Sequence, residues 1–183
     1  MNADGTSARV LSRSLELQGA PAWAADGSAI AVGVVLDRAP RLFTIPLDGQ
    51  GPTPLVPEHS VDPAWSPDGR MVLYSGPDIG TTFEVKGATA GGKTLPLRKL
   101  TLSRGSRHLC FTPDGRSLVA LRGEIGHKDL WSIDLETGAE RQLSEFVPDF
   151  NVRDFDLSPD GRQIVLEQVQ DRSDIVLIDR PGG

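Results

Sequence analysis

The chain has 183 residues, enough for one domain with a substantial buried core, and 38% of them are hydrophobic and 24% charged. Its 20 glycines and 14 prolines predict many turns and short strands rather than long helices. A formal net charge of −6 argues against a nucleic-acid-binding surface, because phosphate contacts need clustered Lys and Arg.

An internal repeat is the most informative feature of the sequence. A hexapeptide that ends in Asp-Gly occurs four times, at residues 22–27, 64–69, 110–115 and 156–161. Its Asp-Gly pairs are 42, 46 and 46 residues apart. A repeat of this length predicts equivalent supersecondary units that bury their apolar faces against one another.

Each repeat predicts four strands. The Asp-Gly step suits a tight hairpin, because Asp bonds its own backbone and Gly accepts positive φ. Second strands are predicted over residues 29–32, 71–74, 118–121 and 164–166, after a first strand that ends near the aromatic residue. Third strands are predicted over residues 41–47, 82–86, 129–135 and 174–179, and fourth strands over residues 53–56, 97–100 and 140–143. Four strands are the content of one propeller blade.

The last repeat lacks a fourth strand, and residues 8–12 resemble the fourth strand at 140–144. We expect residues 8–12 to pair with residues 174–179 and so to remove an exposed sheet edge. The expected fold class is all-β, a single β-propeller domain of four four-stranded antiparallel blades, as a four-bladed ring or a partial arc of a larger propeller. The expected blades span about residues 20–57, 61–101, 106–144 and 152–180, the last completed by residues 8–12.

The second copy of the repeat, Trp65-Ser66-Pro67-Asp68-Gly69-Arg70, resembles the TolB-like or WD-repeat-like propeller families. The first copy departs from the pattern, because Ala24-Ala25 replaces Ser-Pro. The resemblance implies a propeller that binds envelope proteins, with a periplasmic location if the protein is exported. Such propellers usually carry six or more blades, so four blades suggest a piece of a longer propeller or two chains that complete one ring.

Localisation stays open from the residues themselves. The first residues carry no basic stretch followed by an apolar run, so we expect no signal peptide in them. Every apolar stretch is interrupted before it reaches the length needed to cross a bilayer, and we expect no membrane insertion.

The segment Gly87–Thr94 matches the G-x-x-x-x-G-K-T pattern of phosphate-binding loops. Residues 175–179 resemble the apolar strand ending in an acid that assists a magnesium ion in such proteins. The pattern binds phosphate only where a helix follows, whereas residues 95–100 align with a fourth strand of the repeat. We therefore expect no nucleotide site and no cofactor.

Other candidate sites have simpler structural explanations. The aspartates of the four turns could form a carboxylate ring around a cation, but Asx hydrogen bonding explains them without a metal. The histidines His59, His108 and His127 are assigned to unrelated positions of their blades, so we expect surface or loop residues. The single cysteine, Cys110, is expected to be a strand residue rather than a nucleophile. With no hydrolase elbow or zinc-protease motif, we expect no enzyme.

The repeated aromatic residues Trp23, Trp65 and Phe111 are expected to pack between neighbouring blades. The connections between second and third strands differ in length and charge, and loops of this kind commonly carry recognition. The candidate partner-binding residues are Asp37, Arg38, Asp78, Glu124, His127, Lys128, Asp171 and Arg172.

The sequence thus predicts a non-enzymatic propeller scaffold that binds a protein or peptide, with a homodimer as an option if the ring is incomplete. An alternative is the propeller part of a larger enzyme similar to prolyl oligopeptidase. A further alternative is the propeller of a bacterial sensor kinase or transcription regulator, with the other domains outside this chain.

Overall fold

The computed structural model describes residues 6–8, 10–104, 108–124, 126–147 and 151–169. All the regular secondary structure in these residues consists of β-strands. The strands are β1 (Leu17–Trp23), β2 (Ala29–Leu36), β3 (Ala39–Pro46), β4 (Thr53–Pro54), β5 (Val61–Trp65), β6 (Met71–Ile79), β7 (Thr82–Thr89), β8 (Thr94–Ser103), β9 (Cys110–Phe111), β10 (Ser117–Glu124), β11 (His127–Asp134), β12 (Glu140–Gln142), β13 (Asn151–Leu157) and β14 (Ile164–Val169). No membrane-spanning helix occurs in this described part of the chain.

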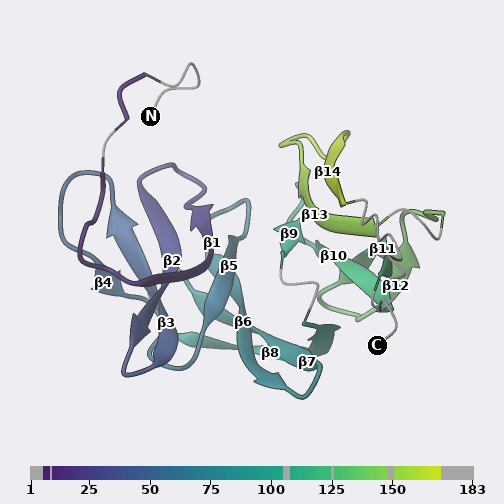
Figure 1. Ribbon diagram of the computed structural model, residues 1–183, viewed down its shortest axis with the longest axis horizontal. Helices are drawn as coiled ribbons and strands as arrows, with labels where there is room; N and C mark the ends of the chain where they lie inside the picture. The colour runs from purple at the N-terminus through teal and green to yellow at the C-terminus, as the bar shows by residue number, and fades with distance from the viewer. Residues whose placement is uncertain (1–5, 9, 105–107, 125, 148–150, 170–183) are drawn as a thin grey trace, which may run out of the picture.

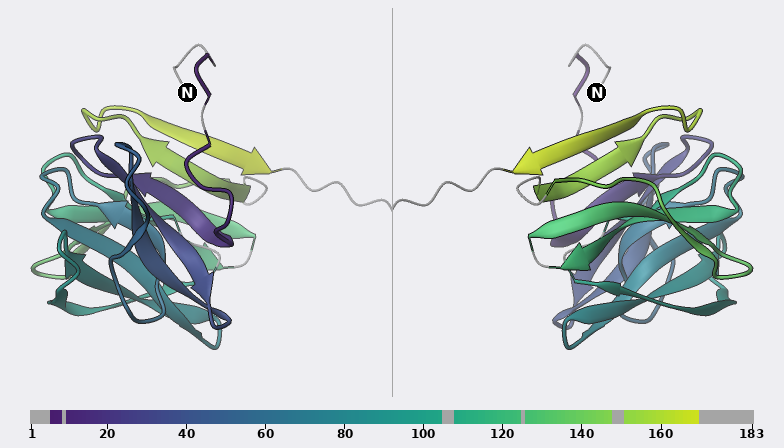
Figure 2. Two further views of the ribbon diagram at one scale, coloured as in Figure 1. Left: turned by 90° about the vertical axis from the view of Figure 1, so that its left-hand side faces the viewer. Right: turned by 90° about the vertical axis from the view of Figure 1, so that its right-hand side faces the viewer.

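The strands form four antiparallel sheets in chain order, which we call blades 1 to 4. Blade 1 is β1-β2-β3-β4, blade 2 is β5-β6-β7-β8, blade 3 is β9-β10-β11-β12, and the described part of blade 4 is β13-β14. The blades follow one another around an arc (Figure 1). Side views show their strong twist, as expected for short antiparallel strands of L-residues (Figure 2).

The repeat predicted this architecture correctly. The expected second strands overlap β2, β6, β10 and β14, and the first three expected third strands overlap β3, β7 and β11. The expected fourth strands coincide with β4, β8 and β12. A closed four-bladed ring is not shown, because the described residues make a partial arc.

The pairing expected between residues 8–12 and residues 174–179 stays a prediction. Residues 8 and 10–12 have no strand geometry, and residue 9 and the whole of 174–179 lie outside the described residues.

The Asp-Gly turns form as their residues require. In blade 2, Asp68 Oδ1 accepts hydrogen bonds from Ser66 Oγ at 2.6 Å and from the Arg70 amide at 3.0 Å. Gly69 has a φ of 69°, in the region that glycine adopts without strain. The turns of blades 3 and 4 repeat this pattern around Asp114 and Asp160.

In the first turn, Asp26 Oδ1 accepts the equivalent hydrogen bond from the Ser28 amide at 2.9 Å, but its side-chain donor is the Ser28 hydroxyl, at 2.7 Å. Ala24 stands there in place of the Ser or Thr of the other turns and has no side-chain oxygen. Local hydrogen bonds therefore account for all four aspartates.

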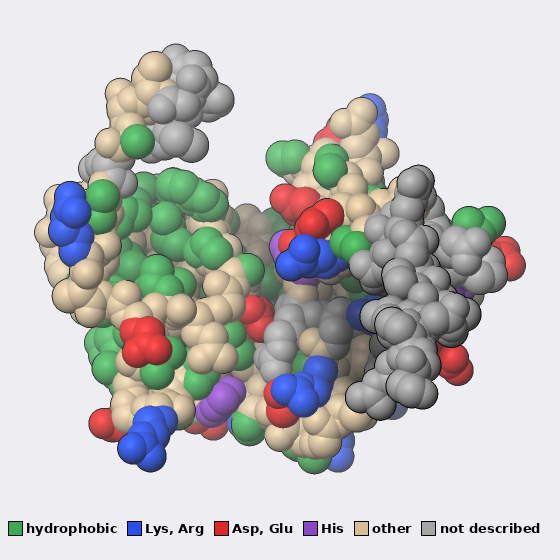
Figure 3. Space-filling model, in the orientation of Figure 1, with side chains coloured by type: hydrophobic (Ala, Val, Ile, Leu, Met, Phe, Trp, Pro, Cys, Tyr) green, Lys and Arg blue, Asp and Glu red, His purple; other side chains and the backbone are tan. Residues whose placement is uncertain are grey.

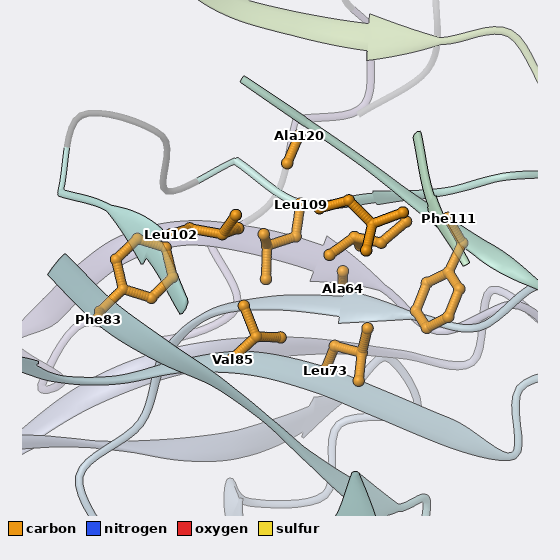
Figure 4. Packing of buried hydrophobic residues seen from close by; sticks show 10 residues of the cluster. Ala64, Leu73, Phe83, Val85, Leu102, Leu109, Phe111 and Ala120 are labelled. Carbon is orange, nitrogen blue, oxygen red and sulfur yellow. The ribbon is translucent and has the colours of Figure 1, made fainter. Parts of the chain in front are cut away.

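The core lies between the blades. A cluster that includes Trp65, Tyr74 and Val72 joins blades 1 and 2. A second cluster between blades 2 and 3 contains Phe111 together with Leu73 and other apolar side chains that interdigitate in Figure 4. This packing confirms the role expected of Trp65 and Phe111.

For Trp23, the expectation that the repeated aromatic residues pack between blades is wrong. Trp23 occupies the equivalent position of blade 1, yet its exposed fraction is 61%. The reason is topological: blade 1 is the first sheet of the described arc, and no sheet among the described residues precedes it. The outer face of blade 1 also keeps its own small cluster, in which Leu15 packs against Val32 and Val34.

Candidate functional site in the central hollow

The six described loop candidates lie at or near the ends of hairpins with two-residue turns rather than in loops of variable length, which corrects the sequence expectation. Asp37 and Arg38 form the two-residue turn between β2 and β3, and both have positive φ, as such a turn requires. Glu124 and His127 are paired across the end of the β10–β11 hairpin. The second strands run beyond the predicted segments because backbone pairing continues to the two-residue turn, whatever the side chains are.

The other predicted residues of these hairpins are engaged locally or lie outside the described residues. Asp78, in β6, makes an ion pair of 2.9 Å with Arg104. Lys128, in β11, is partly buried, and this burial lowers the pKa of its ammonium group. Asp171 and Arg172 lie outside the described residues.

A hollow of about 550 Å³ lies on the inner side of the arc. It is lined mainly by the first strands of the four blades, β1, β5, β9 and β13, which we call the inner strands, together with Arg104 and residues that flank these strands. In Figure 3 charged side chains gather on the wall opposite blade 1. None of the six described loop candidates lines this hollow.

The lining follows the sequence repeat. Two alternate positions in each inner strand, or just before it in blade 3, line the hollow, together with residues between and beside them. The first member of the pair is Ala20, Asp62, His108 or Asp154, and the second is Ala22, Ala64, Cys110 or Asp156. His59 and His127 fall at other positions of the repeat, so the three histidines are unrelated to one another, as expected, but His108 is equivalent to Asp62 and Asp154. Its spacing of 46 residues on either side was the available signal.

Polar groups concentrate where blades 3 and 4 meet. His108 Nδ1 lies 3.1 Å from Asp154 Oδ1, and the Cys110 thiol donates a hydrogen bond of 3.4 Å to Asp156 Oδ1. The His108 ring meets the Phe155 ring edge to face, with centroids 5.1 Å apart. One ring nitrogen of His108, the Cys110 sulfur and one carboxylate oxygen of Asp156 all lie within 4.8 Å of one another.

Cys110 is a strand residue, as expected, and it also lines the hollow. Burial raises the pKa of its thiol to about 11, and the carboxylates of Asp156 and Asp154 add to the effect. The thiol is therefore protonated near neutral pH, which gives no support to a nucleophilic role.

The inner strands of blades 1 and 2 are joined by Asp62. Its side chain is buried, and Oδ1 accepts a hydrogen bond of 3.1 Å from the Ala20 amide. Asp62 has a φ of 52°, a conformation that Asp tolerates better than most residues. Arg104 and Arg153 bring cations to the same hollow, which thus presents both charges.

The phosphate-loop pattern folds as a hairpin. Residues Gly87–Thr89 end β7, and Thr94 begins β8, as the repeat predicts. A Cβ at Gly92 would collide with the carbonyl oxygen of Leu55, so this glycine serves the packing of blade 1 against blade 2. Lys93 donates its backbone amide to Thr89 Oγ1 within the turn. Asp179, the proposed partner of this motif, lies outside the described residues.

Comparison with known proteins supports the fold through structure alone. No family model and no curated protein matches the sequence. TolB from Acinetobacter baumannii is similar, with 20% identity, a TM-score of 0.67, and coverage of 90% of this chain and 41% of that chain. A putative TolB from Agrobacterium tumefaciens gives 18% identity, a TM-score of 0.67, and coverage of 84% and 55%.

A puromycin-hydrolysing peptidase from Mycobacterium tuberculosis is also similar, with 17% identity, a TM-score of 0.64, and coverage of 84% of this chain and 28% of that chain. The chain thus spans only about a quarter to just over a half of the length of these three proteins. At these identities the likeness shows the fold alone, a β-propeller like that of TolB, which agrees with the resemblance of the sequence motifs.

Proposed function

We propose that this chain is a non-enzymatic propeller scaffold that binds a segment of a protein or peptide partner in the hollow. The observation that carries the proposal is the repeated lining: two equivalent positions of every blade, in or just before its inner strand, line one shared cavity of about 550 Å³. Rigid strands hold these side chains, so little order has to be imposed when a partner binds.

The composition of the hollow favours a peptide of mixed polarity. Pro21, Pro63 and Trp65 contribute apolar surface, whereas Asp62, Asp154, Arg104 and Arg153 contribute charge of both signs. Apolar walls with a few placed polar groups are typical of binding cavities. The hairpin ends, with Asp37, Arg38, Asp78, Glu124, His127 and Lys128, form a second proposed contact region for the same partner.

The test is selection of binders from a random peptide library displayed on phage, with the purified chain as the target. A variant with Ala20→Trp fills the hollow, since Ala20 lines it and is exposed. The matched control, Ala139→Trp, places the same side chain at an exposed turn before β12, outside the hollow. We expect selected peptides to lose at least tenfold in affinity for Ala20→Trp and to bind Ala139→Trp as they bind the parent chain. Equal loss in both variants, or in neither, contradicts the proposal.

A second candidate is the propeller portion of a larger peptidase, favoured by the similarity to the puromycin-hydrolysing peptidase. The two proposals differ for the whole protein isolated from its source. Hydrolysis of aminoacyl or peptidyl p-nitroanilides by the whole protein, and none by this chain, supports the second candidate. Absence of hydrolysis by both supports the scaffold. The same isolation reveals a kinase or DNA-binding domain, if the propeller belongs to a sensor or regulator.

The partial arc also supports the proposal that more blades complete the ring, from the same protein or from a second copy of this chain. The solution mass of the purified chain from light scattering separates the two: a dimer supports completion by a second copy, and a monomer supports completion by blades of the same protein.

A further inference from the structure

We propose that His108, Cys110 and Asp156 bind a divalent transition-metal ion of the zinc type in the wall of the hollow, with Asp154 orienting the imidazole. The three donor atoms lie within 4.8 Å of one another and come from both sides of the contact between blades 3 and 4. An imidazole nitrogen, a sulfur and a carboxylate oxygen are the donor types that bind zinc in proteins.

The sulfur and oxygen donors already have the spacing that such an ion requires. Tetrahedral zinc, with bonds of about 2.0 Å to oxygen and about 2.3 Å to sulfur, places these two donors about 3.5 Å apart. The Cys110 sulfur and Asp156 Oδ1 are 3.4 Å apart. The hydrogen bond between them occupies the place that the ion would take, and binding transfers the thiol proton to solvent while sulfur and oxygen both coordinate the metal.

The fourth side chain of the group supports the imidazole. Asp154 Oδ1 lies 3.1 Å from Nδ1 of His108, so the other nitrogen, Nε2, is the one left for a metal. Carboxylates in this position commonly fix the orientation of zinc-binding histidines and make the ring a better donor. The edge-to-face contact with Phe155 restricts the same ring from another side.

The donor set selects the class of ion. Calcium and magnesium prefer complete oxygen shells, whereas sulfur and nitrogen donors favour zinc, cobalt or cadmium. Three protein ligands leave one coordination position of a tetrahedral ion for water or for a group of the bound partner, and all three ligands line the hollow. The equivalent positions of blades 1 and 2 hold Ala20, Ala22, Asp62 and Ala64, which offer no such set.

The test is titration of the reduced, untagged chain with Co²⁺, followed by absorption spectroscopy and by displacement with Zn²⁺. We expect one cobalt ion per chain, with a thiolate-to-cobalt charge-transfer band and the ligand-field bands of tetrahedral cobalt. Cys110→Ala, His108→Ala and Asp156→Ala each introduce the residue that blade 1 has at the same position, so the backbone fits them. We expect Cys110→Ala to abolish the charge-transfer band and each variant to weaken Zn²⁺ binding by about 100-fold or more.

Two further variants separate this site from other causes. Asp154→Asn should weaken Zn²⁺ binding by about 10-fold to 100-fold and keep the charge-transfer band. His59→Ala removes a histidine outside the group and should change nothing. The inference is overturned if the parent chain shows no charge-transfer band, if the band persists in Cys110→Ala, or if His59→Ala weakens binding as strongly as His108→Ala. Unchanged circular dichroism of each variant shows that it has kept its fold.

Discussion

The hydroxyl of Tyr74 donates a hydrogen bond of 2.7 Å to Oε1 of Glu58. Tyr74 comes from β6, and its side chain is fully buried in the cluster between blades 1 and 2. Glu58 comes from the connection between β4 and β5 and also accepts a contact of 3.3 Å from Lys86 Nζ. Burial, together with the Glu58 carboxylate, raises the pKa of Tyr74 far above its ordinary value, so the hydroxyl keeps its proton.

We expect Tyr74→Phe to lower the free energy of unfolding by about 1 to 2 kcal/mol, because one charge-assisted hydrogen bond is lost. Glu58→Ala leaves the buried hydroxyl without its partner and should cost a similar amount or more. Urea unfolding of both single variants and the double variant measures the coupling. A double variant whose loss equals the sum of the single losses would show that the two side chains do not interact.

Stability should fall in acid through the turn aspartates. Hydrogen bonds from Ser66, Thr112 or Ser158, and from Ser28 in the first turn, lower the pKa of Asp68, Asp114, Asp160 and Asp26 below the ordinary value of 3.8. A lowered pKa in the folded state stabilises the fold above the ordinary pKa, and this contribution disappears as the pH falls through the lower one. We expect the melting temperature to drop below about pH 4. Asp68→Asn keeps an acceptor for the turn but cannot ionise, so its melting temperature should depend less on pH there.

The first turn can be improved. Pro67 lies against the next turn, where a Cβ on Gly115 would lie 3.6 Å from Pro67 Cδ, and Ala25 occupies the equivalent place against Gly69. Proline at a compatible turn position reduces the entropy of the unfolded chain. We therefore expect Ala25→Pro to raise the free energy of unfolding by about 0.4 to 1 kcal/mol and Pro67→Ala to lower it by a similar amount. A destabilised Ala25→Pro would show that the first turn has a different backbone conformation.

The repeated tryptophans should differ in importance. Trp65 packs into the cluster between blades 1 and 2, whereas Trp23 is 61% exposed. We expect Trp65→Ala to cost about 3 kcal/mol and Trp23→Ala to change stability by less than about 0.5 kcal/mol. Chemical denaturation checks both. A large loss for Trp23→Ala would mean that another surface covers blade 1 in solution.

The turns and strands could be predicted from sequence because their causes are local. Ser66, Asp68 and Gly69 determine their turn through hydrogen bonds within a few residues. The ends of the second strands could not be predicted from apolar runs. Pairs such as Leu36 with Ala39 and Glu124 with His127 extend the hairpins through backbone hydrogen bonds, which do not depend on hydropathy.

The polar group in the hollow was missed for a different reason. His108 and Cys110 belong to one blade, whereas Asp154 and Asp156 belong to the next, so their proximity depends on how two sheets pack. The repeat alignment showed that Cys110 and Asp156 occupy equivalent positions. Recognising the polar group would also have required the equivalence of His108 and Asp154. The exposure of Trp23 also could not be predicted from the local sequence, because it depends on the place of blade 1 in the arc.

The two equivalent lining positions hold a different pair of side chains in each of the four blades, although the blades share one repeat. In chain order the pairs are Ala with Ala, Asp with Ala, His with Cys, and Asp with Asp. Single substitutions there can therefore alter the chemistry of the cavity wall, one blade at a time, while the Asp-Gly turns and most of the apolar contacts between sheets stay as they are.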